Sequence, residues 1–503
     1  MTGSTSSRLK IAIFIQAFIV VVLLVARYMT VVMQATPDDL VRPACAAEVA
    51  LIGWMAWSWW WVIGTLFDPY MLLVLSASMF HAGQMALEVL GLNRRGFLRG
   101  IFPSEIALDA VCMVVLCFAV MHLGALIALT GSRTVRDSSA ATNPSRLKDI
   151  RMIGWAFFAI SFIPAILVYK DMLEGAMTSG YFTALFGAGQ AATGIAAYKF
   201  VLAEFFPPAA LFLLVGSRDK PFARYFSLGM VLFHCGVYLV VGSRGSAFIT
   251  AVVYAWVWHS LVRPIPKAAI LSAGAFAIFI VFPLIGMMRS TGGGSRFSLD
   301  AIMEKYESMD DPATAGLQET GGTLGTVAYT IQLVPVAHDY ERGRSYAVAS
   351  FTIFPNLFWD INPGLLGRPA EWLVSVVAPK AAYVGASIGY SFIAEAYFNF
   401  GWYGALVLGF IGFCVARMVR WIRDDPDPLV YGCVANIVMP LFWYTRNEAT
   451  GIFRGIVWYG ICPYILVYLL SATRRRSRRA SLPPLPEPAF MERIARCEAR
   501  RVR

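Results

Sequence analysis

The chain has 503 residues, of which 58% are hydrophobic and 15% charged, and its formal net charge is +11. A soluble protein of this length carries roughly a quarter charged residues, so the composition excludes an ordinary soluble domain. Apolar runs of about 20 residues recur along the chain, and in lipid such runs form helices because a helix satisfies its own backbone. The expected fold class is all-α, a polytopic integral membrane protein.

Hydropathy predicts about 12 transmembrane helices with one large polar loop. An N-terminal bundle of about nine spans occupies residues 1–287, the large loop occupies 288–385, and further spans occupy 386–471. The remaining segment, 472–503, is a basic tail that we expect to be disordered. The predicted spans are 11–32, 46–66, 70–91, 106–130, 152–169, 198–216, 225–242, 246–262, 268–287, 402–420, 428–445 and 455–471.

Lysine and arginine in the short loops predict the orientation, because cytoplasmic loops carry an excess of them. This rule places both termini in the cytoplasm and the loop 288–385 on the outer side. Two outer loops do not fit, so either the span count is wrong in places or their arginines have a purpose outside. The exceptions are Arg94, Arg95, Arg99, Arg446 and Arg454.

The tail after the last span contains ten Arg and three Glu. Nucleic-acid binding is one interpretation of such a cluster. A topology signal attracted to anionic lipid headgroups is the interpretation that we favour, so no nucleic-acid partner is expected.

The large loop contains segments that are neither polar linkers nor complete spans. Residues 297–309 have the period of an amphipathic helix, and 324–336 and 345–359 are half-apolar. We expect the two half-apolar segments to lie on the membrane surface or to dip into it.

Two arginines lie at the outer ends of neighbouring predicted spans. Arg244 lies in the turn Gly242-Ser243-Arg244-Gly245-Ser246, whose glycines allow a ligand to approach the backbone closely, and Arg289 follows the ninth span. A guanidinium offers paired donors and a permanent charge, which suits a phosphate oxygen. Together the two could bind one diphosphate. The alternative for each is an arginine that extends to the lipid headgroups.

A polar stripe follows the large loop. If residues 387–401 form a helix, Ser391, Glu395 and Asn399 lie on one face at intervals of four residues. An ionisable residue there is costly unless it faces a cavity or a partner. Glu395 is therefore either a general base or part of a structural ion pair.

Other candidates carry weaker signals. Asp38 and Asp39 follow the first span and could act as a base or metal ligands, although they also fit an ordinary turn or helix start. His338 could take a proton from a hydroxyl, although a surface histidine is the simpler interpretation. No P-loop, dinucleotide-binding, zinc-protease or serine-hydrolase motif is present, and the Cys and His spacing indicates no metal site.

With these residues in view, the chain resembles the O-antigen polymerases, the Wzy-type polysaccharide polymerases of Gram-negative inner membranes. The resemblance covers about 225–420 and lies in the order of short motifs: the Arg244 turn, Arg289, the run 340–346 and the run 391–401. It implies a multi-pass bacterial inner-membrane enzyme with its large loop in the periplasm.

The resemblance also implies a reaction. Such enzymes transfer a growing glycan from undecaprenyl diphosphate to another lipid-linked repeat unit, with the diphosphate as leaving group and no cofactor. Arg244, Arg289 and Glu395 would be catalytic, without a metal. The implied partners are the lipid-linked donor and acceptor, membrane lipids and, as an open possibility, a chain-length regulator. The implied substrate-binding residues are Ser243, Gly245, His338, Arg342, Arg344, Tyr346, Ser391, Tyr397 and Asn399.

Three alternatives stay open. A transporter or flippase of lipid-linked oligosaccharide could also use arginines, although such proteins usually contain two similar halves and this chain does not. An O-antigen ligase would share the donor and differ in the acceptor. A lipid-phosphosugar glycosyltransferase would depend on Asp38 and Asp39.

Overall fold

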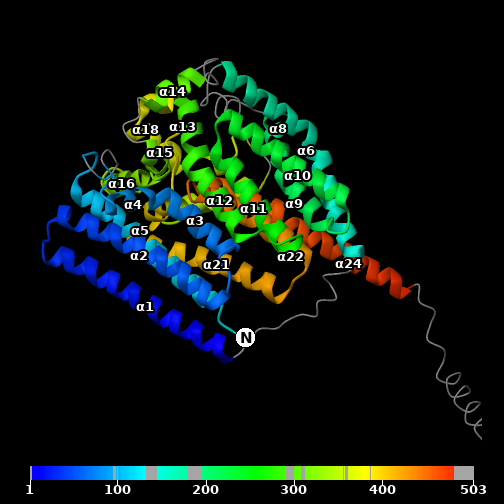
Figure 1. The fold of residues 1–503 in the computed structure, drawn as a ribbon, viewed down its shortest axis with the longest axis horizontal. Coiled ribbons are helices and arrows are strands. Elements are labelled where there is room, and N and C mark those ends of the chain that lie inside the picture. Colours follow the sequence, from blue (N-terminus) through cyan, green and yellow to red (C-terminus); the bar gives the residue numbers. More distant parts are fainter. Residues whose placement is uncertain are drawn as a thin grey trace, which may run out of the picture.

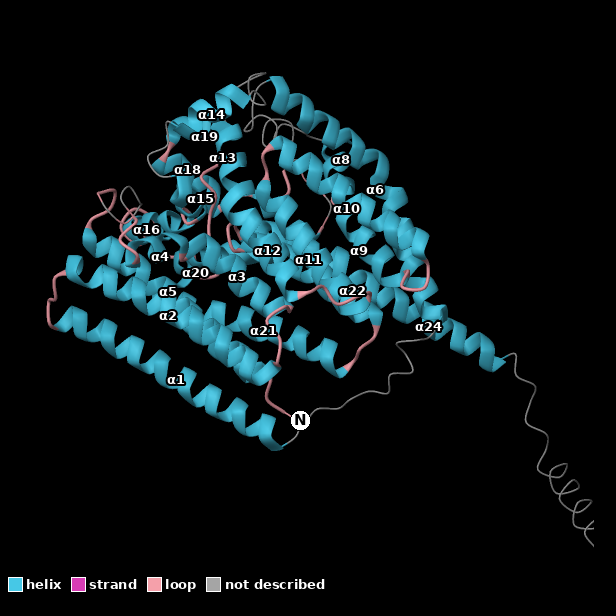
Figure 2. Ribbon diagram, in the orientation of Figure 1, coloured by secondary structure: helices cyan, strands magenta, loops and turns pink. Residues whose placement is uncertain are grey.

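The fold is all-helical across the part of the chain that the structure describes. The computed structural model describes residues 3–480, except 94–97, 99, 132–143, 179–194, 291–298, 308–311, 355, 357–358, 360, 384 and 386. Figure 2 shows helices joined by loops, with no strand among these residues. Arg94, Arg95 and Arg99 lie outside the described residues.

The first half of the chain contains most of the long helices and a few short ones. They are α1 (Gly3–Val32), α2 (Pro37–Ile63), α3 (Pro69–His81), α4 (Gly83–Val89), α5 (Ser104–Ala128), α6 (Pro144–Thr178), α8 (Ile195–Ala203), α9 (Phe206–Gly216), α10 (Pro221–Val241) and α11 (Arg244–Leu261). The helix α12 (Lys267–Phe276) continues through the π-helical η3 (Ala277–Val281) into α13 (Phe282–Ser290).

Shorter helices follow, and then the C-terminal group. The short elements are α14 (Leu299–Glu307), α15 (Pro312–Thr320), α16 (Thr323–Leu333), α17 (Arg344–Ser350), η5 (Phe351–Ile353), η6 (Pro363–Leu365), α18 (Pro369–Val377) and α19 (Pro379–Tyr383). The last group is α20 (Phe392–Phe400), η7 (Gly401–Gly404), α21 (Ala405–Asp424), α22 (Pro428–Tyr444), η8 (Ala449–Gly451), α23 (Ile452–Gly455), η9 (Ile456–Ile461) and α24 (Cys462–Ala480). The predicted amphipathic helix at 297–309 corresponds to α14.

The described helices contain nine candidate membrane spans. The pair α3–α4, bent by 64°, would be a tenth. A polytopic helical protein is therefore confirmed, but the predicted count of about 12 is not. Two of the predicted spans correspond to α11, which is not among the nine, and to α22, which has only 17 residues. The last helix, α24, reaches Ala480, so the first part of the predicted tail is helical.

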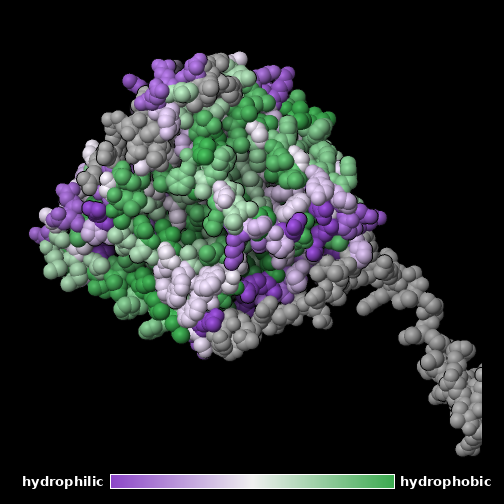
Figure 3. Space-filling view, viewed as in Figure 1, coloured by the Kyte–Doolittle hydropathy of each residue, from purple (hydrophilic) through white to green (hydrophobic). Residues whose placement is uncertain are grey.

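The outer surface of the long helices suits lipid. On α1, for example, Phe14 is 74% exposed and Phe18 62% exposed, which water would penalise. On the face drawn in Figure 3, hydrophobic residues cover the middle of the bundle, and hydrophilic residues gather at the top and toward the lower edge. This pattern is typical of a helix bundle that crosses a bilayer.

Two polar residues within the apolar part of α1, Gln16 and Arg27, have partners on neighbouring helices. The Gln16 amide donates to the carbonyl of Ala119 at 2.8 Å and accepts from the Trp54 indole at 2.7 Å. Arg27 pairs with Asp109 of α5 at 2.6 Å. Because an unpaired polar group is costly in lipid, these contacts fix α1 against α2 and α5.

The helices α5 and α21 pack backbone to backbone. A Cβ added at Gly124 would lie 2.0 Å from the carbonyl oxygen of Gly409, and one at Gly412 would lie 2.1 Å from that of Met121. Small residues allow such close crossings, which association in a membrane depends on because lipid supplies no hydrophobic driving force.

The segment between α13 and α20 packs into the bundle. A Cβ at Gly321 would lie 2.7 Å from the backbone nitrogen of Gln84, so the start of α4 touches the α15–α16 turn. His81, at the bend between α3 and α4, bonds through Nε2 to the Ser391 hydroxyl at 2.6 Å. Figure 1 shows α14, α15, α16 and α18 at the end of the molecule opposite the N-terminus. Two cavities with polar residues in their walls are lined in part by this segment, through Thr320 and Arg368.

We predict that Gly124→Ala lowers the melting temperature of the detergent-solubilised protein by several degrees, because overpacking of this kind costs about 1–3 kcal/mol. Gly53→Ala is the matched control, since a Cβ there meets no atom within 4 Å. Melting can be followed by size-exclusion chromatography after heating. Equal melting temperatures for the two variants would contradict the close α5–α21 crossing.

Candidate functional site

Arg244 lies at the turn between α10 and α11, as predicted. Gly242 ends α10 with φ of 102°, a left-handed conformation that glycine adopts without strain, and Arg244 begins α11. The Arg244 residue is only 2% exposed. Its Nη1 donates to the carbonyl of Phe282 at 2.9 Å, and the guanidinium lies 5.3 Å from the centre of the Phe282 ring. The start of α13 therefore fixes the Arg244 side chain.

Arg244 lines a cavity of about 650 Å³, which we call the arginine chamber. Three other residues of the predicted turn, Ser243, Gly245 and Ser246, also line it, as does Phe282. A Cβ at Gly245 would lie 3.2 Å from the Trp443 ring, so the glycine allows α22 to approach α11 closely. The size is typical of a ligand site.

Arg446, the residue second after α22, lines the same chamber. Its guanidinium lies 5.4 Å from the centre of the Phe80 ring, and its carbonyl accepts from the Tyr390 N–H at 3.2 Å. Gly389, with φ of 79°, lets the 387–390 loop pass beside this arginine. Arg446 was not predicted as a site residue. Its signal was the unexplained positive charge in an outer loop.

A second cavity of about 490 Å³ adjoins the first, and we call it the paired chamber. The two cavities share wall residues, which are Glu204, Tyr238, Ser246, Trp443 and Asn447. Each charged residue described in the wall of the paired chamber forms an ion pair with a residue of opposite charge. Arg454 Nη2 contacts both carboxylate oxygens of Glu204 at 2.8 Å, and Arg368 pairs with Glu448.

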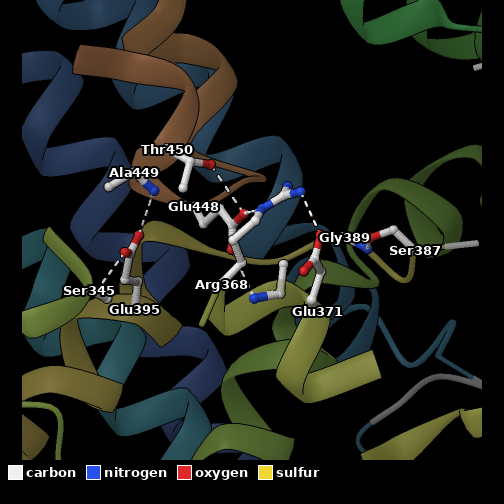
Figure 4. A network of polar contacts seen from close by, with 10 residues as sticks. Ser345, Arg368, Glu371, Ser387, Gly389, Glu395, Glu448, Ala449 and Thr450 are labelled. Atoms are coloured by element: carbon white, nitrogen blue, oxygen red, sulfur yellow. Dashed lines mark hydrogen bonds and ion pairs between the residues drawn. The ribbon is translucent and has the colours of Figure 1, made fainter. Parts of the chain in front are cut away.

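Arg368 and Glu448 belong to the polar network in Figure 4. This network joins the segment between α13 and α20, which we call the long segment, to the C-terminal helices. Glu448 also accepts from the N–H of Ala370 at 2.9 Å, and Arg368 contacts Glu371 at 2.7 Å. Burial lowers the pKa of Arg368, but the carboxylates of Glu448 and Glu371 raise it by more, so this pKa stays above its usual value. The wall of the paired chamber is thus rigidly held.

The side chains of the polar stripe on α20 form hydrogen bonds with other parts of the protein. Ser391 caps α20 and bonds to His81. Glu395 accepts from the Ser345 hydroxyl and from the Ala449 N–H, each at 2.8 Å. Figure 4 shows Glu395 between these two partners. The described lining of the two chambers does not include Glu395.

Asn399 completes the stripe. Its Oδ1 accepts from the Gly343 N–H at 2.9 Å, and its Nδ2 donates to the Ser345 hydroxyl at 2.7 Å. Together with Glu395 it holds the start of α17 against α20. The arrangement favours the structural alternative for the stripe, with backbone and hydroxyl partners in place of an ion pair.

The structure separates most other predicted site residues from the chambers. Arg289 lies in the last turn of α13, about 10 Å along the helix from Phe282 at 1.5 Å per residue, and its side chain lies outside the described residues. Arg342 and Arg344 are exposed. The described lining of the chambers includes neither of them.

Two predicted residues, His338 and Tyr346, pack against α20, and a third, Tyr397, belongs to it. His338 contacts the rings of Trp372 and Phe398, and Tyr397 packs edge-on against Tyr340. Burial, followed by the Glu395 carboxylate, raises the pKa of Tyr346 well above its usual value, so its phenol stays neutral.

Asp38 and Asp39 lie in the first turn of α2, where a carboxylate is stabilised by the helix dipole. Asp38 accepts from Ser104, and Asp39 from Thr36 at 2.5 Å. Neither is among the described residues that line the chambers. Within the described ranges, no group of three or more His, Cys, Asp or Glu side chains is placed to hold a metal.

We expect Glu395→Ala to lower the melting temperature, because the buried Ser345 hydroxyl and Ala449 N–H would each lose an acceptor, at about 1–3 kcal/mol per group. Glu395→Gln keeps one accepting oxygen, so it should melt closer to wild type and retain glycan extension. Heated size-exclusion profiles and glycan gels measure the two properties. Loss of extension by Glu395→Gln at an unchanged melting temperature would instead make Glu395 a base.

Comparison with protein families agrees with this architecture. The model of the family described as O-antigen polysaccharide polymerase Wzy matches residues 10–476, which extends the resemblance from the second half to nearly the whole chain. No curated protein and no solved structure matches the chain. With its apolar helices, the protein is a multi-pass protein of the bacterial inner membrane, and it belongs to the O-antigen polysaccharide polymerase Wzy family.

Proposed function

We propose that the protein extends a glycan by joining undecaprenyl-diphosphate-linked repeat units at the periplasmic face of the membrane. The growing glycan is transferred to a new lipid-linked unit, and undecaprenyl diphosphate is the leaving group. Family membership supports polymerisation in polysaccharide biosynthesis. The leaving group and its binding site are inferred from the arginine chamber.

The observation that carries the proposal is the buried Arg244 in a chamber that it shares with Arg446. The diphosphate gains negative charge as its bond to the sugar breaks, so fixed cations lower the barrier. A guanidinium donates paired hydrogen bonds to phosphate oxygens and keeps its charge at all working pH values. Its effect is larger in a chamber shielded from bulk water.

Fixed side chains make this charge pre-organised. Phe282 holds Arg244 through its carbonyl and its ring, and Phe80 packs against Arg446. The sugar–diphosphate bond supplies the energy for transfer, so the chamber needs only to position the donor and stabilise the leaving group.

The long segment contributes walls to both chambers. Thr320, Ser387 and Gly389 line the arginine chamber, and Arg368 lines the paired chamber. These residues flank or belong to the segment that we predicted as a large loop. This arrangement supports a substrate-binding role for that segment.

The direct test is a glycan gel of cells that lack the gene and are complemented with variants. We expect deletion to leave single repeat units on lipid A, and wild type to restore a ladder. Arg244→Ala and Arg446→Ala should each reduce extension about 100-fold or more, the scale for losing one charge-stabilising group. Arg263→Ala is the control, because this exposed arginine lies beyond the opposite end of α11.

Protein levels must be equal across the set. A full ladder from stable Arg244→Ala protein would overturn the diphosphate site. Loss of all lipid A-linked glycan on deletion would indicate a ligase or a transporter instead.

A further inference from the structure

We propose that the paired chamber holds the acceptor saccharide, and that Glu204 is the catalytic base that takes the proton of the acceptor hydroxyl. This inference rests on the proposed function, because it assumes that the donor diphosphate occupies the arginine chamber. It assigns the second substrate and the base to residues that the sequence motifs did not include.

Glu204 lies where the two chambers meet. It occupies the break between α8 and α9, and it is the one carboxylate among the described residues that lines both chambers. Its side chain is 46% exposed although the neighbouring Ala203 and Phe206 are buried, which fits a side chain that faces a cavity. Asp171 and Glu448 line the paired chamber but not the arginine chamber.

The contacts of Glu204 orient it and leave room for a substrate. Arg454 contacts both carboxylate oxygens at 2.8 Å, and the Tyr459 hydroxyl donates to Oε2 at 3.1 Å. A carboxylate offers about four lone-pair positions. The bonds described for Glu204 use three of them, so Oε1 can still accept from a hydroxyl.

The charges of the two chambers differ in a way that assigns the substrates. Two arginines and Glu204 are the charged residues described in the wall of the arginine chamber, and Glu204 is already paired with Arg454. In the paired chamber, Arg368 pairs with Glu448, and Asp171 pairs with Lys199. An anionic diphosphate therefore fits the first chamber, and an uncharged saccharide fits the second.

The paired chamber also has the chemistry that a saccharide needs. Tyr238, Trp443 and Tyr459 offer aromatic surface, while Asn447 and Thr450 offer hydrogen-bonding groups. Ligand sites of this size combine apolar walls with a few placed polar groups. Trp443 and Tyr238 belong to both chambers, so a donor and an acceptor would meet beside them.

The reaction step follows from this placement. The acceptor hydroxyl oxygen forms a bond to the anomeric carbon of the donor sugar, and its proton passes to Glu204. The bond from that carbon to the phosphate oxygen breaks, and its electron pair leaves with the diphosphate beside Arg244 and Arg446. Glu204 then releases the proton to water.

The first experiment uses purified full-length protein in liposomes with lipid-linked repeat units isolated from the deletion strain. We expect Glu204→Gln to reduce extension by about 10²–10⁴-fold, the scale for losing a general base. Its residual rate should rise with pH as hydroxide replaces the base. Inhibition by added inorganic diphosphate should be no weaker than in wild type, because the substitution removes a negative charge from the wall of the arginine chamber. Gln can still accept from Arg454, so the variant should fold.

The second experiment fills the paired chamber in steps. Gly451 lines it, and a Cβ there meets no atom within 4 Å, so larger residues can be added without a backbone clash. We expect the acceptor KM to rise with the size of the added side chain, least for Gly451→Ala and at least tenfold for Gly451→Phe, with diphosphate inhibition unchanged. Gly53→Phe is the control that should extend glycans normally, because Gly53 lies in α2 and is not among the described residues that line the chambers. An unchanged acceptor KM in Gly451→Phe would overturn the acceptor site.

The outcomes separate the two proposals. Normal extension by Glu204→Gln, or a pH-independent loss together with weaker diphosphate inhibition, would overturn the role of Glu204 as base. If diphosphate does not inhibit wild type, or inhibits Arg244→Ala equally well, the proposed diphosphate site itself fails.

Discussion

A guanidinium inside an apolar helix bundle is stable only where partners or a polar cavity receive it, and the site is organised around this constraint at Arg244. The α10–α11 turn delivers the side chain, and the start of α13 receives it through the carbonyl and ring of Phe282. The end of α22 closes the cavity with Trp443, which Gly245 allows to approach. Helices that are distant in sequence thus converge on one charge.

The same constraint separates polar residues that only join helices from polar residues that also line a cavity. Gln16 and Arg27 of α1 are paired with neighbouring helices, and Glu395 and Asn399 are paired with the start of α17. Such groups hold the bundle together. Arg244 and Glu204 also have protein contacts, but they line cavities large enough for a ligand. Polarity within an apolar segment marks an important residue, and only the tertiary structure shows which kind.

This distinction explains what could be predicted from the sequence. Long apolar runs have few stable forms in lipid, so the helical membrane fold was predictable, although bent and broken helices made the span count uncertain. Arg244 was predictable because its turn is short and flanked by glycines. Glu395 and Asn399 do share α20, but the helix begins at Phe392 and not at residue 387, and Ser391 is its N-cap. The partners of the stripe at Ser345 and Ala449 come from distant segments.

Two residues of the proposed site were not predicted, for different reasons. Arg446 joins Arg244 only because the 387–390 loop and α3 pack beside it, which no local pattern reveals. Glu204 lay inside a predicted span, 198–216, and the structure breaks that span next to it. The sequence signal was an acidic residue within an apolar segment, which is costly in lipid unless it faces a partner or a cavity.

Both proposals depend on the binding of the lipid carrier's diphosphate in the arginine chamber. The most direct measurement is a cryo-electron microscopy map of the protein in nanodiscs with undecaprenyl diphosphate added. We expect diphosphate density between the guanidinium groups of Arg244 and Arg446, with the isoprenoid chain leaving toward lipid. Ordered diphosphate density elsewhere, with the chamber empty, would contradict it.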